Sequence, residues 1–483
     1  MYEKRDGENE YIGNLLKDYI DKTVDLYDNI KDKPVCPAVN REALSELNKA
    51  DVPELGRPLE EVYNEMINDV YSSVILAQHP RSFSCVPSTV SMLSFMGDVM
   101  TSAYNPHASC KINAPASDLI EKKLIKFMCK KAGYTEGSGG LFVSGGSIAN
   151  LTALTAARDA KLLPVERCKA VVYVSDQTHY SVAKGLHIIG FNKEQIKLIP
   201  TDEEFRMDVA ALKSEIENDV AAGKKPFAIV ASAGTTNTGS IDPLKEISEL
   251  CREYDMWMHV DGAYGASVLL SEKNRERLNG IELSDSLSWD AHKWLFQTYG
   301  CSVVLVKNKA DLIHSFAAHP EYLKDAETSE NNIEFWDLGP ELTRPARALK
   351  LWITLNAMGT EAVAKAIDHG CEIAEYAAGL VRIDRDWEIV SDTGLGIINF
   401  RYVAENKTER ELNEINRIIA KEITESGFAE IFTTELRGKK VLRMCTIHPE
   451  TTEKDISDTI EKMKKIGERL CRKNDLSELK IAL

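Results

Sequence analysis

The sequence contains no apolar run approaching the ~18 residues that a membrane-spanning helix requires, which argues against a membrane protein. Its first residues, MYEKRDGENEYIGNLL, are polar and mixed in charge, so we expect no signal peptide. The ten cysteines include no CxxC pair, the spacing typical of zinc and redox sites, and reduced, buried thiols are expected instead. These absences predict a cytoplasmic protein without a metal site.

Positive charge is also scarce, because 59 lysines and arginines face 75 aspartates and glutamates, for a net charge of −16. Nucleic-acid-binding proteins need a basic face, so no nucleic-acid partner is expected. Low-complexity tracts and repeats of fixed period are missing as well. The composition, 43% apolar and 28% charged over 483 residues, is that of a folded protein too long for one ordinary core. A multi-domain protein acting on small molecules fits these properties.

The middle of the chain alternates short strand-like runs with longer helix-like runs. The strand-like runs are GLFVSG, KAVVYVSD, FAIVASAG, MWMHVDG, DSLSWDAH and CSVVLVKN. Strands that alternate with helices predict an α/β fold whose largely parallel sheet is covered by helices on both faces. We expect a helical segment over residues 1–80, a large domain over 81–355 and a smaller α+β domain of three strands over 356–483. The second boundary is predicted within one long helix, near PARALKLWITLNAMG.

Ligands of open α/β sheets bind at the carboxyl ends of the strands, so those ends are the candidate site. One strand-like run ends in SGGSIANLTA, where Gly146 and Ser147 would begin a helix whose exposed amides can bind a phosphate. Gly146 stands where a nucleotide-binding P-loop needs lysine, which favours a monophosphate over a nucleoside triphosphate. The same turn without any ligand is an equally good interpretation of this segment alone.

Four further strand ends carry polar groups: Asp261 in MWMHVDG, His179 in SDQTHYSVAKG, Thr235 with Thr236 in SAGTTNTG, and Lys293 in SLSWDAHKWLF. Singly, each has an ordinary structural explanation, such as a helix cap, a turn, or a lysine stem that packs on tryptophan. Together they are the parts that hold pyridoxal 5'-phosphate (PLP). A lysine forms an imine, a carboxylate keeps the ring nitrogen protonated, a histidine covers the ring face, and a glycine turn binds the phosphate.

HVDGAYGAS followed by SLSWDAHKWL, with SDQTHYSVAKG and FVSGGSIANLTAL upstream, resembles the group II PLP-dependent amino-acid decarboxylases. This family includes the aromatic L-amino-acid, histidine and glutamate decarboxylases. AGTTNTGSIDPL and DAHKWLFQTYGC are similar to bacterial tryptophan decarboxylases in particular. The resemblance implies PLP-dependent transferase fold type I, as in aspartate aminotransferase, with a mostly parallel seven-stranded sheet. It also implies a homodimer whose N-terminal helices wrap the partner and whose active sites lie at the interface.

The resemblance also implies a role for each matching residue. Lys293 would be the Schiff-base lysine, Asp261 the partner of the ring nitrogen and His179 the stacking histidine, and these three form the catalytic set. Cofactor binding would fall to Gly146, Ser147, His179, Thr235, Thr236, Asp261, Ala263, His292 and Lys293. Substrate binding would fall to Cys85, Val86, Pro87, Ser88, His107, Asn113 and Trp336.

The implied activity is decarboxylation of an aromatic L-amino acid to its amine, with tryptophan first and phenylalanine or tyrosine next. One departure concerns a loop tyrosine that protonates Cα in many relatives. Tyr322 matches an earlier family position, and Phe335 and Trp336 stand where that tyrosine is expected, in a segment interpreted as a lid. His107 could give the proton instead, or the outcome could shift to oxidative deamination by an aromatic aldehyde synthase.

Three other interpretations stay open. The substrate could be another amino acid, such as glutamate or histidine. An aminotransferase or carbon–sulfur lyase would share the fold and could use Arg443 for the substrate carboxylate. A non-enzymatic scaffold would require a decayed site, whereas the lysine, aspartate, histidine and glycine turn are all present.

Overall fold

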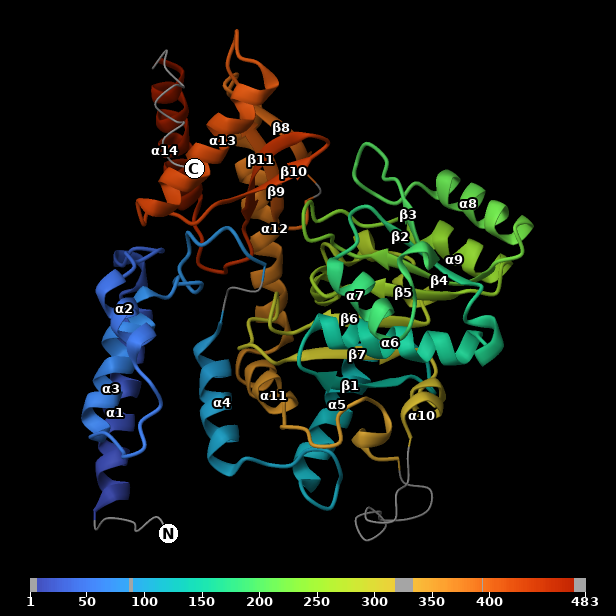
Figure 1. Ribbon diagram of the computed structural model, residues 1–483, viewed down its shortest axis with the longest axis horizontal. Coiled ribbons are helices and arrows are strands. Elements are labelled where there is room, and N and C mark those ends of the chain that lie inside the picture. Colours follow the sequence, from blue (N-terminus) through green and yellow to red (C-terminus); the bar gives the residue numbers. More distant parts are fainter. Residues whose placement is uncertain (1–6, 87–89, 318–332, 393, 473–483) are drawn as a thin grey trace.

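The computed structural model describes residues 7–86, 90–317, 333–392 and 394–472. Three N-terminal helices, α1 (Glu8–Asp28), α2 (Arg41–Lys49) and α3 (Leu59–Glu65), lie together on one flank, apart from the large sheet (Figure 1). Within the described ranges, no helix combines the length and apolar character needed to cross a bilayer. Six of the ten cysteines are buried, whereas Cys85 and Cys168 are exposed, which differs from the expectation of buried thiols.

A seven-stranded sheet forms the centre of the large domain. Its strands are β1 (Gly139–Val143), β2 (Ala170–Ser175), β3 (Ile196–Ile199), β4 (Lys225–Ser232), β5 (Trp257–Asp261), β6 (Ser286–Asp290) and β7 (Ser302–Val306). They lie in the order β1-β7-β6-β5-β4-β2-β3, and β7 alone is antiparallel to both of its neighbours. The six longer strands are buried along nearly their whole length because helices cover both faces of the sheet. The predicted seven-stranded, mostly parallel sheet is confirmed.

The helices of this domain are α4 (Met92–Tyr104), α5 (Pro115–Lys131), α6 (Gly146–Lys161), α7 (Tyr180–Ile188), α8 (Val209–Ala221), α9 (Leu244–Glu253) and α10 (Ala310–Phe316). Their starts follow local chemistry: Pro115 occupies the first turn of α5, and the Asp208 carboxylate accepts the Ala210 and Ala211 amides before α8. Helix α6 packs on β5, β6 and β7 and begins at the carboxyl edge of the sheet (Figure 1). Its first turn therefore faces the strand ends that carry the candidate site.

The link to the small domain differs from the single long helix that the sequence predicted. Helix α11 (Ala348–Met358) ends at Gly359, and α12 (Thr360–Ile383) begins directly after it. Gly359 has φ 80°, a left-handed value that a helix interior does not allow, so the chain changes direction there. The junction thus consists of two helices separated by one glycine.

The small domain contains an antiparallel sheet of four described strands, one more than predicted. These are β8 (Trp387–Asp392), β9 (Ile397–Tyr402), β10 (Phe432–Leu436) and β11 (Lys439–Cys445), in the order β10-β11-β9-β8. Helix α13 (Glu409–Glu425) packs on it, and α14 (Glu453–Arg472) packs on α12 and α13. Strand β10 was missed because it is a largely solvent-facing edge strand whose sequence, FTTEL, lacks a clear apolar alternation.

Candidate functional site

A cavity of about 410 Å³ lies at the carboxyl ends of β4, β5 and β6, below the start of α6. Parallel strands place their carboxyl ends at one edge of the sheet, which is why residues from distant parts of the chain meet here. The cavity brings together most of the predicted site: Cys85, Val86, Gly146, Ser147, His179, Thr235, Thr236, Asp261, Ala263, His292 and Lys293.

Lys293 lies in the turn after β6, where a buried carboxylate holds its ammonium group. Its Nζ is 3.3 Å from Oδ2 of Asp290, and the same oxygen is 3.5 Å from Nε2 of His292. The other oxygen, Oδ1, is buried and has no hydrogen-bond partner among the described residues. The sequence did not assign Asp290 a role, although its spacing from Lys293 indicates a contact within one turn.

Asp261, the last residue of β5, is fixed by three donors. The Asn150 amide donates to Oδ2 at 2.9 Å, while the Ser288 hydroxyl and the Ala263 backbone N–H each donate to Oδ1 at 3.1 Å. Burial by itself raises the pKa of Asp261, but the positive charge of Lys293 and these hydrogen bonds outweigh it, so the pKa lies below its usual value. An ionised carboxylate at this position can hold a protonated ring nitrogen.

The turn between β1 and α6 has room for an anion but not for a side chain. A Cβ on Gly146 would lie 2.9 Å from Oδ2 of Asp290 and 3.3 Å from Cβ of Ala263. The exposed amides at the start of α6 carry partial positive charge, and no lysine occupies the turn. These features suit a monophosphate.

Three further predicted cofactor ligands line the same cavity. Nδ1 of His292 is 3.1 Å from the carbonyl oxygen of Cys301, and burial lowers the pKa of the ring although Asp290 opposes the shift. The Thr235 hydroxyl is engaged with Thr238 at 2.7 Å and Ser240 at 3.0 Å. Thr236, in contrast, is exposed at the cavity. Together with Lys293, Asp261 and the glycine turn, these groups fit PLP.

Three predicted substrate residues do not line this cavity in the part of the chain that the structure describes. His107 and Asn113 contact each other, with Nδ1 and Nδ2 3.1 Å apart. Trp336 was placed in a lid, but it lies in a short helix over Phe335–Asp337 and is only 4% exposed. It was misplaced because two adjacent aromatic residues pack into the core rather than face solvent. Pro87, Ser88 and Tyr322 fall outside the described residues.

Arg443, on β11 of the small domain, also lines the cavity. The sequence analysis considered it only as a carboxylate ligand in an aminotransferase. It is 8% exposed, and its Nη1 donates to the carbonyl oxygen of Ser84. Its Nε and Nη2 have no hydrogen-bond partner among the described residues. A buried guanidinium with unused donors favours an anionic ligand group in the cavity.

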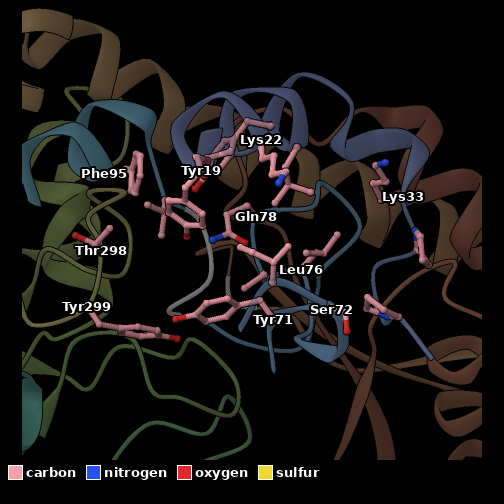
Figure 2. Close-up of a pocket in the computed structure, with 18 of the residues that line it drawn as sticks. Tyr19, Lys22, Lys33, Tyr71, Ser72, Leu76, Gln78, Phe95, Thr298 and Tyr299 are labelled. Atoms are coloured by element: carbon pink, nitrogen blue, oxygen red, sulfur yellow. Dashed lines mark hydrogen bonds between the residues drawn. The ribbon is translucent and has the colours of Figure 1, made fainter. Parts of the chain in front are cut away.

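A second cavity, of about 650 Å³, adjoins the first and separates the N-terminal helices from the large domain. Figure 2 shows Tyr19 and Lys22 on the side of the N-terminal helices, and Thr298 and Tyr299 across the space. His292 and Tyr299 line both cavities. A group that fills the second cavity would therefore contact two residues that also line the candidate site.

Comparison with known proteins identifies the same chemistry. Residues 42–403 match the pyridoxal-dependent decarboxylase conserved domain. An aromatic-L-amino-acid decarboxylase of Bacillus atrophaeus is 41% identical over 454 residues, which cover 93% of this chain and 94% of the relative.

Two solved structures have a similar fold. TDC of Oryza sativa, solved with PLP and tryptamine, has a TM-score of 0.90 and 26% identity, covering 97% of this chain and 100% of the other. A 4-hydroxyphenylacetaldehyde synthase of Rhodiola rosea has a TM-score of 0.87 and 26% identity, covering 95% and 98%.

Proposed function

The chain belongs to the pyridoxal-dependent decarboxylase family, and from that premise we propose that it decarboxylates an aromatic L-amino acid, with tryptophan first and phenylalanine or tyrosine next. The protein is a PLP-dependent amino-acid decarboxylase. The relative of 41% identity, which acts on aromatic L-amino acids, supports the substrate class. A cytoplasmic location, where thiols stay reduced, is part of the proposal.

The convergence of Lys293, Asp261 and the Gly146 turn in one cavity is the observation that carries this proposal. Lys293 would hold the cofactor aldehyde, Asp261 the ring nitrogen and His179 the ring face, while Gly146, Ser147 and His292 would hold the phosphate. Bound PLP supplies an electron sink for the pair released from the breaking bond. The cavity residues would hold the substrate carboxylate in place for bond cleavage, and such positioning can lower a barrier by up to ~7–11 kcal/mol.

The test is to incubate the purified protein and PLP with a panel of amino acids and to measure carbon dioxide, amine, aldehyde and hydrogen peroxide together. Equal amounts of carbon dioxide and amine from tryptophan support the proposal. Keto acid without carbon dioxide would favour an aminotransferase and contradict it.

Aldehyde formation is a second candidate outcome, and the missing loop tyrosine favours it. Phe335 and Trp336 are buried, so neither occupies the place of a proton donor in the cavity. The similarity to an aldehyde synthase from Rhodiola rosea is consistent with this outcome. Aldehyde and hydrogen peroxide in place of amine, in the same assay, would establish it.

Arg443 favours a further candidate, a substrate with an acidic side chain such as glutamate. Its two unused donors could bind either the α-carboxylate common to all amino acids or a second carboxylate. Replacing Arg443 with methionine separates the two. Loss of activity on every substrate indicates the α-carboxylate, whereas loss confined to glutamate indicates a side-chain carboxylate.

A homodimer with active sites at the interface is also part of the proposal. One face of α4 is apolar and exposed, with Met96 and Val99 each 44%, Met100 52% and Tyr104 87% exposed. Such a row is typical of a surface that another chain covers. The second cavity and the position of His107 outside the first are consistent with a contribution from a partner. Sedimentation of the parent protein and of Met100→Glu should give a dimer and a monomer, respectively.

A further inference from the structure

A series of buried hydrogen bonds connects Trp257, the first residue of β5, with Asp261, its last residue. Nε1 of Trp257 lies 2.8 Å from Oγ of Ser286, which lies 2.8 Å from Nδ1 of His259. Nε2 of His259 lies 2.9 Å from Oδ1 of Asn150, and Nδ2 of Asn150 lies 2.9 Å from Oδ2 of Asp261. All five side chains are buried, so water does not compete for these contacts.

The same asparagine also leads to His179. Nδ2 of Asn150 donates to Oγ of Ser181 at 3.1 Å, and that oxygen lies 2.8 Å from Nδ1 of His179. The backbone N–H of Ser181 donates to the same ring nitrogen at 3.3 Å. Asn150 therefore contacts, directly or through one hydroxyl, both groups that would touch the cofactor ring.

The two ends of the path to Asp261 decide the direction of every hydrogen bond on it. The Trp257 indole can only donate, and the ionised Asp261 carboxylate can only accept. Asn150 must then present its nitrogen to Asp261 and its oxygen to His259. His259 consequently donates from Nε2, and a ring that carries only this proton accepts the Ser286 hydroxyl at Nδ1. Burial lowers the pKa of His259 to about 4, which agrees with a neutral ring carrying one proton.

The branch to His179 is directed in the same way. A backbone N–H can only donate, so Nδ1 of His179 is an acceptor and its ring proton sits on Nε2. Nε2 is the nitrogen left to meet a ligand in the cavity, where its N–H suits a carboxylate.

We propose that Asn150, oriented by His259, is a positioning residue that joins Asp261 and His179 into one unit with fixed proton positions. The roles of Asp261 and His179 toward the cofactor rest on the proposed function, whereas the directions of the hydrogen bonds do not. Asn150 acts through these two residues, because they and not Asn150 would contact the ring. Removing the Asn150 side chain should therefore weaken the binding of the cofactor ring by both Asp261 and His179.

The first test reads the ring forms in the parent protein and uses substitutions only to assign the signals. Nitrogen-15 NMR of the cofactor-free protein with labelled histidine distinguishes the two neutral ring forms, and His259→Gln and His179→Gln identify the signals. We expect the ring proton of His259 and of His179 to lie on Nε2. A proton on Nδ1 of either ring would overturn the proposal.

The second test measures the dissociation constant of PLP by equilibrium binding. Asn150→Ala should raise it about 10- to 100-fold, the effect expected when hydrogen bonds to a charged group are lost. Ser181→Ala should raise the dissociation constant less than Asn150→Ala does. In the Asn150→Ala background it should cause no further increase. Ser181→Thr, which keeps the hydroxyl, should have the parent value. Unchanged affinity in Asn150→Ala, or additive effects in the double variant, would contradict the proposal.

Asn416→Ala is the matched control, because this buried asparagine bridges Tyr402 and α13 in the small domain and should leave PLP affinity unchanged. If the parent protein releases no carbon dioxide but shows the expected ring forms, the proposed function is refuted. The proton positions are then still confirmed. Carbon dioxide release together with an unaltered Asn150→Ala affinity refutes only the positioning role.

Discussion

Lys293 and Asp290 form an ion pair at the end of β6, with Nζ 3.3 Å from Oδ2. The aspartate is buried and comes three residues before the lysine, so one turn of chain supplies both partners. A charged amine is thereby kept at the wall of the cavity. The pair explains how the protein holds this amine beside the cofactor site.

Replacing Lys293 with alanine should abolish turnover, by at least about 1,000-fold, because no other amine would bind the cofactor aldehyde. Release of carbon dioxide measures the loss. Lys213→Ala, on the exposed side of α8, is the control and should keep parent activity. Borohydride treatment followed by mass spectrometry should place the pyridoxyl group on Lys293, and a label on any other residue would refute this assignment.

Asp261→Asn should lower kcat about 100-fold or more while the protein stays folded, since a neutral amide cannot keep the ring nitrogen protonated. Asp285→Asn is matched to it, because Asp285 also accepts a backbone amide at an end of this sheet but lies away from the cavity. The two variants should have similar unfolding curves and very different rates. Similar values of kcat in the two variants would show that catalysis does not need the charge of Asp261.

A buried ion pair should dominate the stability of the segment that follows residue 333. Nη2 of Arg344 lies 2.6 Å from Oε1 of Glu121 and also donates to the Phe142 carbonyl oxygen at 2.6 Å. Because neither residue is accessible to water, Glu121→Gln should lower the free energy of unfolding by about 3–5 kcal/mol. Urea unfolding measures it, and Glu361→Gln, in an exposed pair with Lys365, should lower the free energy of unfolding far less.

Stability should fall as the pH drops from about 6.5 to about 4. Burial lowers the pKa of His259 to about 4, so in this window the unfolded chain binds a proton that the folded chain refuses. The contribution is fully present above pH 6.5, is lost toward pH 4, and is on the order of 3 kcal/mol. Urea unfolding at several pH values should show a shallower dependence for His259→Gln. An equal slope in both proteins would contradict this.

The strand ends of the large domain could be predicted because their chemistry is local. Asp261, Lys293, Thr236 and His179 each lie at the end of a strand-like run or within four residues of it, and the carboxyl ends of parallel strands meet at one edge. Their presence in one cavity agrees with that expectation. Phe335 and Trp336 were misplaced because an apolar pair beside polar residues fits a lid as well as a core, and only packing distinguishes the two.

The sequence by itself determined the alternation of strands and helices, the glycine turn at Gly146 and the lysine that follows β6, since each depends on neighbours along the chain. The tertiary structure decided what enters the cavity from elsewhere. Arg443 arrives from the small domain, and Asn150 meets Asp261 across 111 residues. Such contacts depend on which polar groups the packed fold removes from water. The direction of their hydrogen bonds depends on the same packing, because buried groups can bond only to one another.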